Sequence, residues 1–224
     1  MYQGPPCLGI KPGDSNQTIK EAAFDFAHGI GYMSVATVAI DGRTPTNRGL
    51  EVHYLDSEKN LYVGASRGKH FYDEMEKQPY ISALAIDVVA VRINAWLEKD
   101  DRESVRERYW ELNQGTKKMY HKDLSNFQVY RLVRGEGEIF HVYEHDAIAR
   151  ARFSFGGEKP RPWSYEINER CIGCGICVEK CMMDTIHMVG NVAKINHYGC
   201  NECGICFSSC PHNSIDKLEF VKEL

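Results

Sequence analysis

Hydrophobic positions near the N-terminus repeat at the spacing of an amphipathic helix. Five apolar residues fall on one helical face: Ile19, Ala22, Ala23, Phe26 and Ala27. Thr18 and Glu21 have the spacing of a capping box, and Gly29 is a typical helix stop. The sequence therefore predicts a helix that starts near Ser15 and ends near Gly29.

The chain that follows is mostly rich in β-forming residues separated by turns. Strands are predicted over residues 32–40, 46–55, 61–65, 80–97 (broken near Asp87) and 127–143, the last strand region. Gly135 and Gly137 predict a bulge or a hairpin in that region. Short helices are predicted at 69–77 and at 103–112, the latter capped by Asp100 or Asp101 and closed at Gly115.

Hairpins with few helices and no β-α-β rhythm favour an antiparallel barrel. Gly156, Gly157, Pro160 and Pro162 make 154–162 a predicted linker. We therefore expect an α+β protein with a mainly antiparallel split barrel at 1–153, whose core spans about 24–144. A small second domain is expected at 163–224.

Cysteine distribution separates these two parts. Eight of the nine cysteines lie between Cys171 and Cys210, and Cys7 stands alone in a Pro/Gly-rich leader, where a bland thiol is expected rather than a ligand. The eight cysteines form two copies of the motif Cys-x2-Cys-x2-Cys-x3-Cys, the first phrase starting at Cys171 and the second phrase at Cys200. Such a duplication predicts two similar units packed about a pseudo-twofold axis.

Three chemistries compete for these thiols. A disulfide scaffold fits poorly because three thiols crowd into one seven-residue loop. Structural zinc usually takes two Cys-x2-Cys pairs with a longer spacer. Three thiolates from one loop with a fourth from elsewhere suit a [4Fe–4S] cubane, which is the interpretation we favour.

From about Trp163 to Phe220 the tail resembles the bacterial two-cluster ferredoxin domain. The resemblance implies two [4Fe–4S] clusters, in which the fourth cysteine of each phrase ligates the other cluster. One cluster would bind Cys171, Cys174, Cys177 and Cys210, and the other Cys181, Cys200, Cys203 and Cys206. Pro211 follows the second phrase as in the family, whereas Met182 replaces proline after the first.

Composition excludes several other classes. The formal net charge of -4 gives no basic field for nucleic acid. No apolar run approaches the roughly 20 residues of a membrane helix, and residues 1–13 do not resemble a secretory signal. We therefore expect a soluble cytoplasmic protein without a membrane or nucleic-acid partner.

The body, over about 24–144, resembles the pyridoxamine phosphate oxidase-like FMN-binding split barrel. The match rests on the motifs Pro45-Thr-Asn-Arg-Gly-Leu50, Leu61-Tyr-Val-Gly-Ala-Ser66 and Arg67-Gly-Lys69. It implies bound FMN, with a homodimer that holds it between subunits. Phosphate needs cations and a helix N-terminus, so the candidate FMN contacts are Arg48, Ser66, Arg67 and Lys69, with Asn94 a weaker candidate near the isoalloxazine.

Joining a flavin domain to two clusters predicts a converter between single-electron and two-electron chemistry. The leading hypothesis is an FMN-dependent reductase that takes electrons from reduced ferredoxin or a similar donor and passes them to an unknown small molecule. The alternative is a module that relays electrons between protein partners, and a redox or flavin sensor is a third. The terminal substrate-binding segment of the oxidase is not recognisable, so we reject pyridoxamine phosphate oxidation. No catalytic side chain is assigned.

Overall fold

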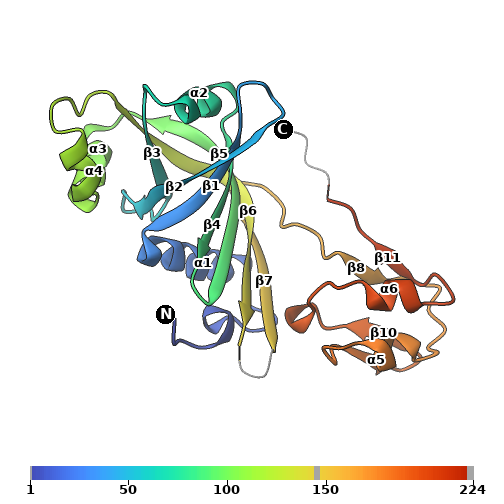
Figure 1. The fold of residues 1–224 in the computed structure, drawn as a ribbon. Helices are drawn as coiled ribbons and strands as arrows, with labels where there is room; N and C mark the ends of the chain where they lie inside the picture. Colours follow the sequence, from blue (N-terminus) through green and yellow to red (C-terminus); the bar gives the residue numbers. More distant parts are fainter. Residues whose placement is uncertain (1, 144–146, 221–224) are drawn as a thin grey trace.

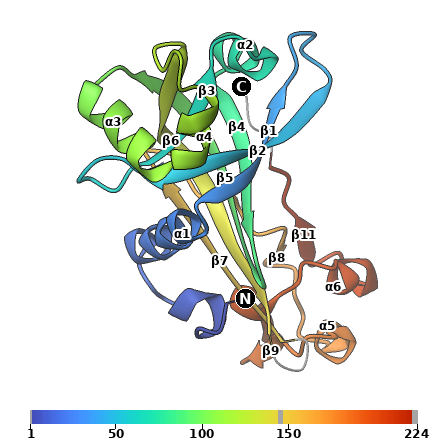
Figure 2. The same cartoon turned by 60° about the vertical axis from the view of Figure 1, so that its left-hand side comes forward.

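A computed structural model describes residues 2–143 and 147–220 (Figure 1). The predicted domain edges at residue 144 and at 221–224 lie outside the described residues. Figure 1 shows a barrel with helices at its ends and a small second domain beside the β6–β7 edge, and Figure 2 shows the same arrangement after rotation.

The first helix, α1 (Asn16–Ile30), lies against the barrel. Its cap is Ser15, whose hydroxyl accepts a hydrogen bond from the Thr18 backbone N–H at 3.1 Å. The predicted capping box at Thr18 is therefore wrong, because the N-cap lies three residues earlier, at Ser15. The predicted stop at Gly29 is also wrong, because the helix continues to Gly31, which adopts the left-handed conformation at φ 72°.

Six antiparallel strands close into a barrel. They are β1 (Tyr32–Val38), β2 (Pro45–Tyr54), β3 (Leu61–Ser66), β4 (Tyr80–Ile86), β5 (Val89–Asp100) and β6 (Phe127–Val142). Their order is β3-β2-β1-β4-β5-β6, and β3 also pairs with β6, which closes the ring. The interior is filled by buried aliphatic side chains such as Val35, Ile81, Ile93 and Leu132. The predicted antiparallel split-barrel class is confirmed.

A seventh strand, β7 (Ile148–Phe155), extends the sheet beyond the ring. The sequence did not predict it, and it includes the first two residues of the predicted linker. The hairpin expected at Gly135 and Gly137 is absent, since β6 runs straight through both and pairs with β7. A β-carbon at Gly137 would lie 2.3 Å from the Phe153 ring, so these glycines serve close strand packing. The register shift lies opposite Trp96 and Leu97 instead.

Two helical segments cover the ends of the barrel. Helix α2 (His70–Lys77) buries Phe71 and Met75 at one end. Helix α3 (Glu103–Leu112) begins after Arg102 without a side-chain cap, because the Asp100 carboxylate binds the Arg102 side chain instead. Gly115 does not end the helical region as predicted; it lies inside α4 (Gln114–Met119).

The leader folds into the short 3-10 helix η1 (Pro6–Gly9). Cys7 is fully buried there, and its backbone N–H donates to Nδ1 of His141 at 3.1 Å. Cys7 therefore belongs to the barrel core and is not one of the cysteines that line the thiol cavity of the small domain.

The small domain consists of two related halves. The first contains β8 (Tyr165–Ile167), α5 (Ile176–Lys180) and β9 (Ile186–Val189), and the second β10 (Val192–Ile195), the 3-10 helix η3 (His197–Gly199), α6 (Ile205–Ser209) and β11 (Ile215–Lys217). β8 pairs with β11 and β9 pairs with β10, so each sheet joins the two halves. Within the described ranges, no helix is long and apolar enough to cross a membrane.

Candidate functional site: two thiol clusters and a hollow on the barrel

The folded chain gathers the predicted ligands of one cluster around a single cavity. Cys171, Cys174 and Cys177 from the first phrase line it together with Cys210 from the second. Burial and the neighbouring thiols raise the pKa of Cys177. Because a buried thiolate is unfavourable alone, bound iron would supply the charge that stabilises it. These four residues fit a [4Fe–4S] cluster.

The second predicted ligand set also comes together. The Cys206 thiol interacts electrostatically with those of Cys200 and Cys203, and the Cys200 thiol interacts with that of Cys181. Burial, reinforced by these thiols, raises the pKa of Cys206 to about 11. All nine cysteines lie in the described residues and carry free thiols, so the structure gives no support to a disulfide scaffold.

In both halves of the small domain, the fourth cysteine of the phrase accepts a hydrogen bond from a backbone N–H. The backbone N–H of Thr185 donates to Sγ of Cys181 at 3.4 Å, and that of Ser214 donates to Sγ of Cys210 at 3.3 Å. Burial opposes ionisation at both, but these donors prevail and lower the pKa of each thiol. Hydrogen bonds to ligand sulfur also raise the reduction potential of a bound cluster.

Three predicted FMN contacts lie together where β3 leads into α2. Ser66 ends the strand and is buried, Arg67 follows it, and Lys69 is the N-cap of α2. The Arg67 guanidinium donates to the neutral Oε1 of Gln128 at 2.9 Å, so its charge is retained. Among the described residues Lys69 has no ion pair, and no side chain caps α2. Two cations beside free helix N–H groups fit a phosphate.

Arg48 lies at the same end of the barrel but is already engaged. Its guanidinium stacks over Phe71 of α2, with 5.0 Å to the ring centroid, and pairs with Glu74 at 3.0 Å. Glu74 is buried, and Thr46 donates to it at 2.8 Å. Because this carboxylate balances the arginine, Arg48 contributes less positive charge to a phosphate than the sequence predicts.

Asn94 lies elsewhere, on the outer face of β5. Its amide donates to Oε1 of Glu136 at 2.6 Å, and both side chains are buried. The structure therefore does not place Asn94 with the three residues at the β3–α2 junction.

Near Asn94 the outer face of the sheet forms a hollow of about 500 Å³. Its lining comes from six strands: Ser34, Ala36, Asn47, Ser82, Leu84, Ala90, Arg92, Glu138, Phe140 and Arg150. Charged and apolar side chains thus meet in one concave surface, a composition typical of small-molecule sites.

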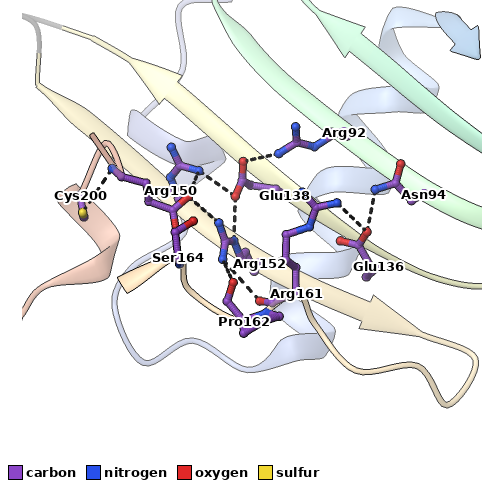
Figure 3. A network of polar contacts seen from close by, with 11 residues as sticks. Arg92, Asn94, Glu136, Glu138, Arg150, Arg152, Arg161, Pro162, Ser164 and Cys200 are labelled. Carbon is purple, nitrogen blue, oxygen red and sulfur yellow. Dashed lines mark hydrogen bonds and ion pairs between the residues drawn. The ribbon is translucent and has the colours of Figure 1, made fainter. Parts of the chain in front are cut away.

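A buried ionic network connects this hollow with the small domain (Figure 3). Glu138 accepts hydrogen bonds from Arg92 at 2.8 Å, from Arg150 at 2.9 Å and from Arg152 at 2.8 Å. Arg150 and Arg152 also pair with Glu202 of the small domain, at 3.0 and 2.7 Å. The network therefore runs from the wall of the hollow to the loop that carries Cys200.

Sequence reasoning missed Arg150, Arg152, Glu138 and Glu202. One signal was present in the sequence: where the first phrase has Gly173, the second has Glu202. A large charged residue at a position suited to glycine marks a site where the side chain is needed.

The comparisons with known proteins agree with this geometry. A family of 4Fe-4S dicluster domains matches residues 170–215. Among solved structures, a NimC/NimA family protein from Clostridium acetobutylicum is 24% identical, with 60% of this chain and 92% of that chain covered and a TM-score of 0.50. PhzG from Burkholderia lata, in complex with tetrahydrophenazine-1-carboxylic acid, is 15% identical, with 70% and 94% covered and a TM-score of 0.50.

A pyridoxamine 5'-phosphate oxidase-related, FMN-binding protein from Nostoc punctiforme is 14% identical, with 65% of this chain and 98% of that chain covered and a TM-score of 0.38. The search of curated proteins found no match. The barrel shares its split-barrel fold with the NimC/NimA family protein and with PhzG, and residues 170–215 match a 4Fe-4S dicluster domain.

Proposed function

We propose that this protein is an iron–sulfur flavoprotein oxidoreductase. Two [4Fe–4S] clusters would pass single electrons from a low-potential donor such as reduced ferredoxin to FMN, which supplies two-electron transfer to a small-molecule substrate. The observation that carries the proposal is the packing of the dicluster domain onto the barrel through Glu202 and the buried Arg150 and Arg152. Electron transfer over a short distance between the two domains requires such a fixed interface.

The barrel residues support FMN as the second cofactor. The motifs around Arg48 and Lys69 resemble those of the FMN-binding family, and the β3–α2 junction offers two cations to a phosphate. The family resemblance also leads us to propose a homodimer in which the partner completes the flavin site.

The hollow on the barrel favours an enzyme over a simple relay. A relay between proteins needs an exposed flavin edge and little else, whereas a volume of about 500 Å³ can hold a small molecule. Arg92, whose side chain is 43% exposed in its wall, would orient an electron-poor or anionic acceptor.

Rapid mixing under anaerobic conditions tests this function. Wild-type protein loaded with iron, sulfide and FMN is mixed with a reduced two-cluster ferredoxin, and flavin absorbance is followed. Cys203→Ser should abolish this reduction while dithionite still reduces the flavin directly. Cys7→Ala, which changes a buried cysteine of the barrel, is the matched control and should behave as wild type.

Two results would contradict the proposal. Flavin bleaching by ferredoxin at the wild-type rate in Cys203→Ser would show that electrons bypass the clusters. Reduced protein that reacts with protein acceptors but with no small acceptor in a panel of nitroaromatics, quinones and enones would favour the relay.

A further inference from the structure

The two cluster sites differ in their relation to the barrel. Among the described residues, the cavity around Cys171 and Cys210 is lined only by residues between Ile167 and Ile215 of the small domain. Cys200, in contrast, directly follows η3, which packs against β7. Within η3, the Tyr198 hydroxyl donates to the backbone oxygen of Ile10 at 2.8 Å. The site containing Cys200 is therefore the one beside the barrel.

Glu202 occupies an unusual backbone conformation for a residue with a large side chain. In the duplicated phrase it takes the place of Gly173, and both are left-handed, with φ of 57° for Glu202 and 73° for Gly173. A β-carbon disfavours this region, so a non-glycine residue persists there only when its surroundings hold it.

The surroundings of Glu202 come from the barrel and the connecting segment. Its carboxylate accepts hydrogen bonds from Arg150 at 3.0 Å, from Arg152 at 2.7 Å and from the Ser164 backbone N–H at 2.7 Å. Its own backbone N–H donates to Sγ of Cys200 at 3.3 Å. Glu202 thus contacts both a predicted cluster ligand and the barrel.

The charges explain why this contact is difficult to break. The side chains of Arg150 and Arg152 are only 9% and 4% exposed, and Glu138 is the carboxylate on their other side. Nε of Arg150 is buried without a hydrogen-bond partner among the described residues. Without Glu202, the buried guanidinium groups of Arg150 and Arg152 would share the carboxylate of Glu138. One negative charge would then offset the cost of burying two positive charges only in part.

We infer that Glu202 is a positioning residue for electron transfer, and that the cluster of Cys181, Cys200, Cys203 and Cys206 is the one that exchanges electrons with the barrel. The other cluster then faces the external donor. Each transfer between the domains would move one electron from the reduced cluster to the flavin, with no bond formed or broken. This inference rests on the proposed function.

The test compares Glu202→Gln with Asp216→Asn in loaded protein. Asp216 is a matched control: its carboxylate belongs to the same domain, pairs with Arg170 at 3.6 Å and is half exposed. We expect both variants to keep wild-type iron and sulfide. In Glu202→Gln the amides of β7 should exchange with deuterium about tenfold faster, and flavin reduction by ferredoxin should slow by a similar factor.

Conservative replacement separates charge from folding. Glu202→Asp keeps the carboxylate on a shorter stem and should fall between wild type and Glu202→Gln in both measurements. If Glu202→Gln loses iron, the same comparison is made on Glu202→Asp. Asp216→Asn should match wild type.

Wild-type exchange and wild-type flavin reduction in iron-replete Glu202→Gln would overturn the inference. Failure of the proposed function gives a different result, in which the flavin of the wild-type protein itself is not reduced through the clusters. Deuterium exchange then still reports whether Glu202 holds the domains together.

Discussion

Replacing Glu138 with glutamine removes the charge at the centre of the buried ionic network. Its side chain is only 7% exposed and accepts hydrogen bonds from three arginines, Arg92, Arg150 and Arg152. Removing one partner of a buried ion network costs roughly 3–5 kcal/mol. At about 2–4 °C per kcal/mol for a chain of this size, Glu138→Gln should lower the melting temperature by about 6–20 °C.

A surface ion pair on the same barrel provides the control. Glu98 pairs with Arg131 at 3.5 Å, but its side chain is 64% exposed, so Glu98→Gln should cost less than about 1 kcal/mol. Anaerobic thermal unfolding followed by far-UV circular dichroism measures both variants. Equal shifts would refute the argument that burial makes the Glu138 network strong.

The pH dependence gives a second check. Burial alone would raise the pKa of Glu138, but Arg150, Arg152 and Arg92 outweigh it and hold the pKa below its ordinary value. A lowered pKa contributes stability above the unfolded pKa of about 4.3, and this stability is lost as pH falls through the folded value. The difference between wild type and Glu138→Gln should therefore be constant near neutral pH and shrink in acid below about pH 4.

Three further outcomes are expected. Anaerobically purified protein should contain about eight irons and eight sulfides per chain, unchanged in Cys7→Ala; bound zinc without sulfide would contradict this. Lys69→Ala or Arg67→Ala should weaken FMN binding by roughly 1.5–3 kcal/mol in fluorescence titrations, and unchanged affinity would show that the phosphate binds elsewhere. Residues 165–224 hold eight acidic against five basic residues, so reduction by a donor with a basic surface should slow as salt increases; a salt-independent rate would exclude this steering.

Much of the fold could be predicted because it is encoded locally. The strands around Val35 and Ile93 follow from β-forming residues between turns, and the thiol clusters follow from cysteine spacing within short loops. Strand β7 escaped prediction because its Ala-Arg-Ala-Arg segment resembles an exposed stretch. Arg150 and Arg152 are buried only because carboxylates from β6 and from the small domain neutralise them.

The site was predictable only where its residues are close in sequence. Ser66, Arg67 and Lys69 are found together because one strand-to-helix passage carries them. Arg48 and Asn94 were assigned without knowledge of their partners. Glu74 and Glu136, which engage them, approach through tertiary packing that no local pattern encodes.

The position of β7 at the end of the sheet has a consequence for how the protein could be divided. β7 pairs only with β6 among the described strands, so its other side is an unpaired edge, the kind of edge that recruits strands from other chains. The small domain lies beside this edge and neutralises its arginines. A barrel produced without residues 156–224 would present a bare edge at which Arg150 and Arg152 share Glu138 as their remaining carboxylate, so we expect it to aggregate more readily than the whole chain.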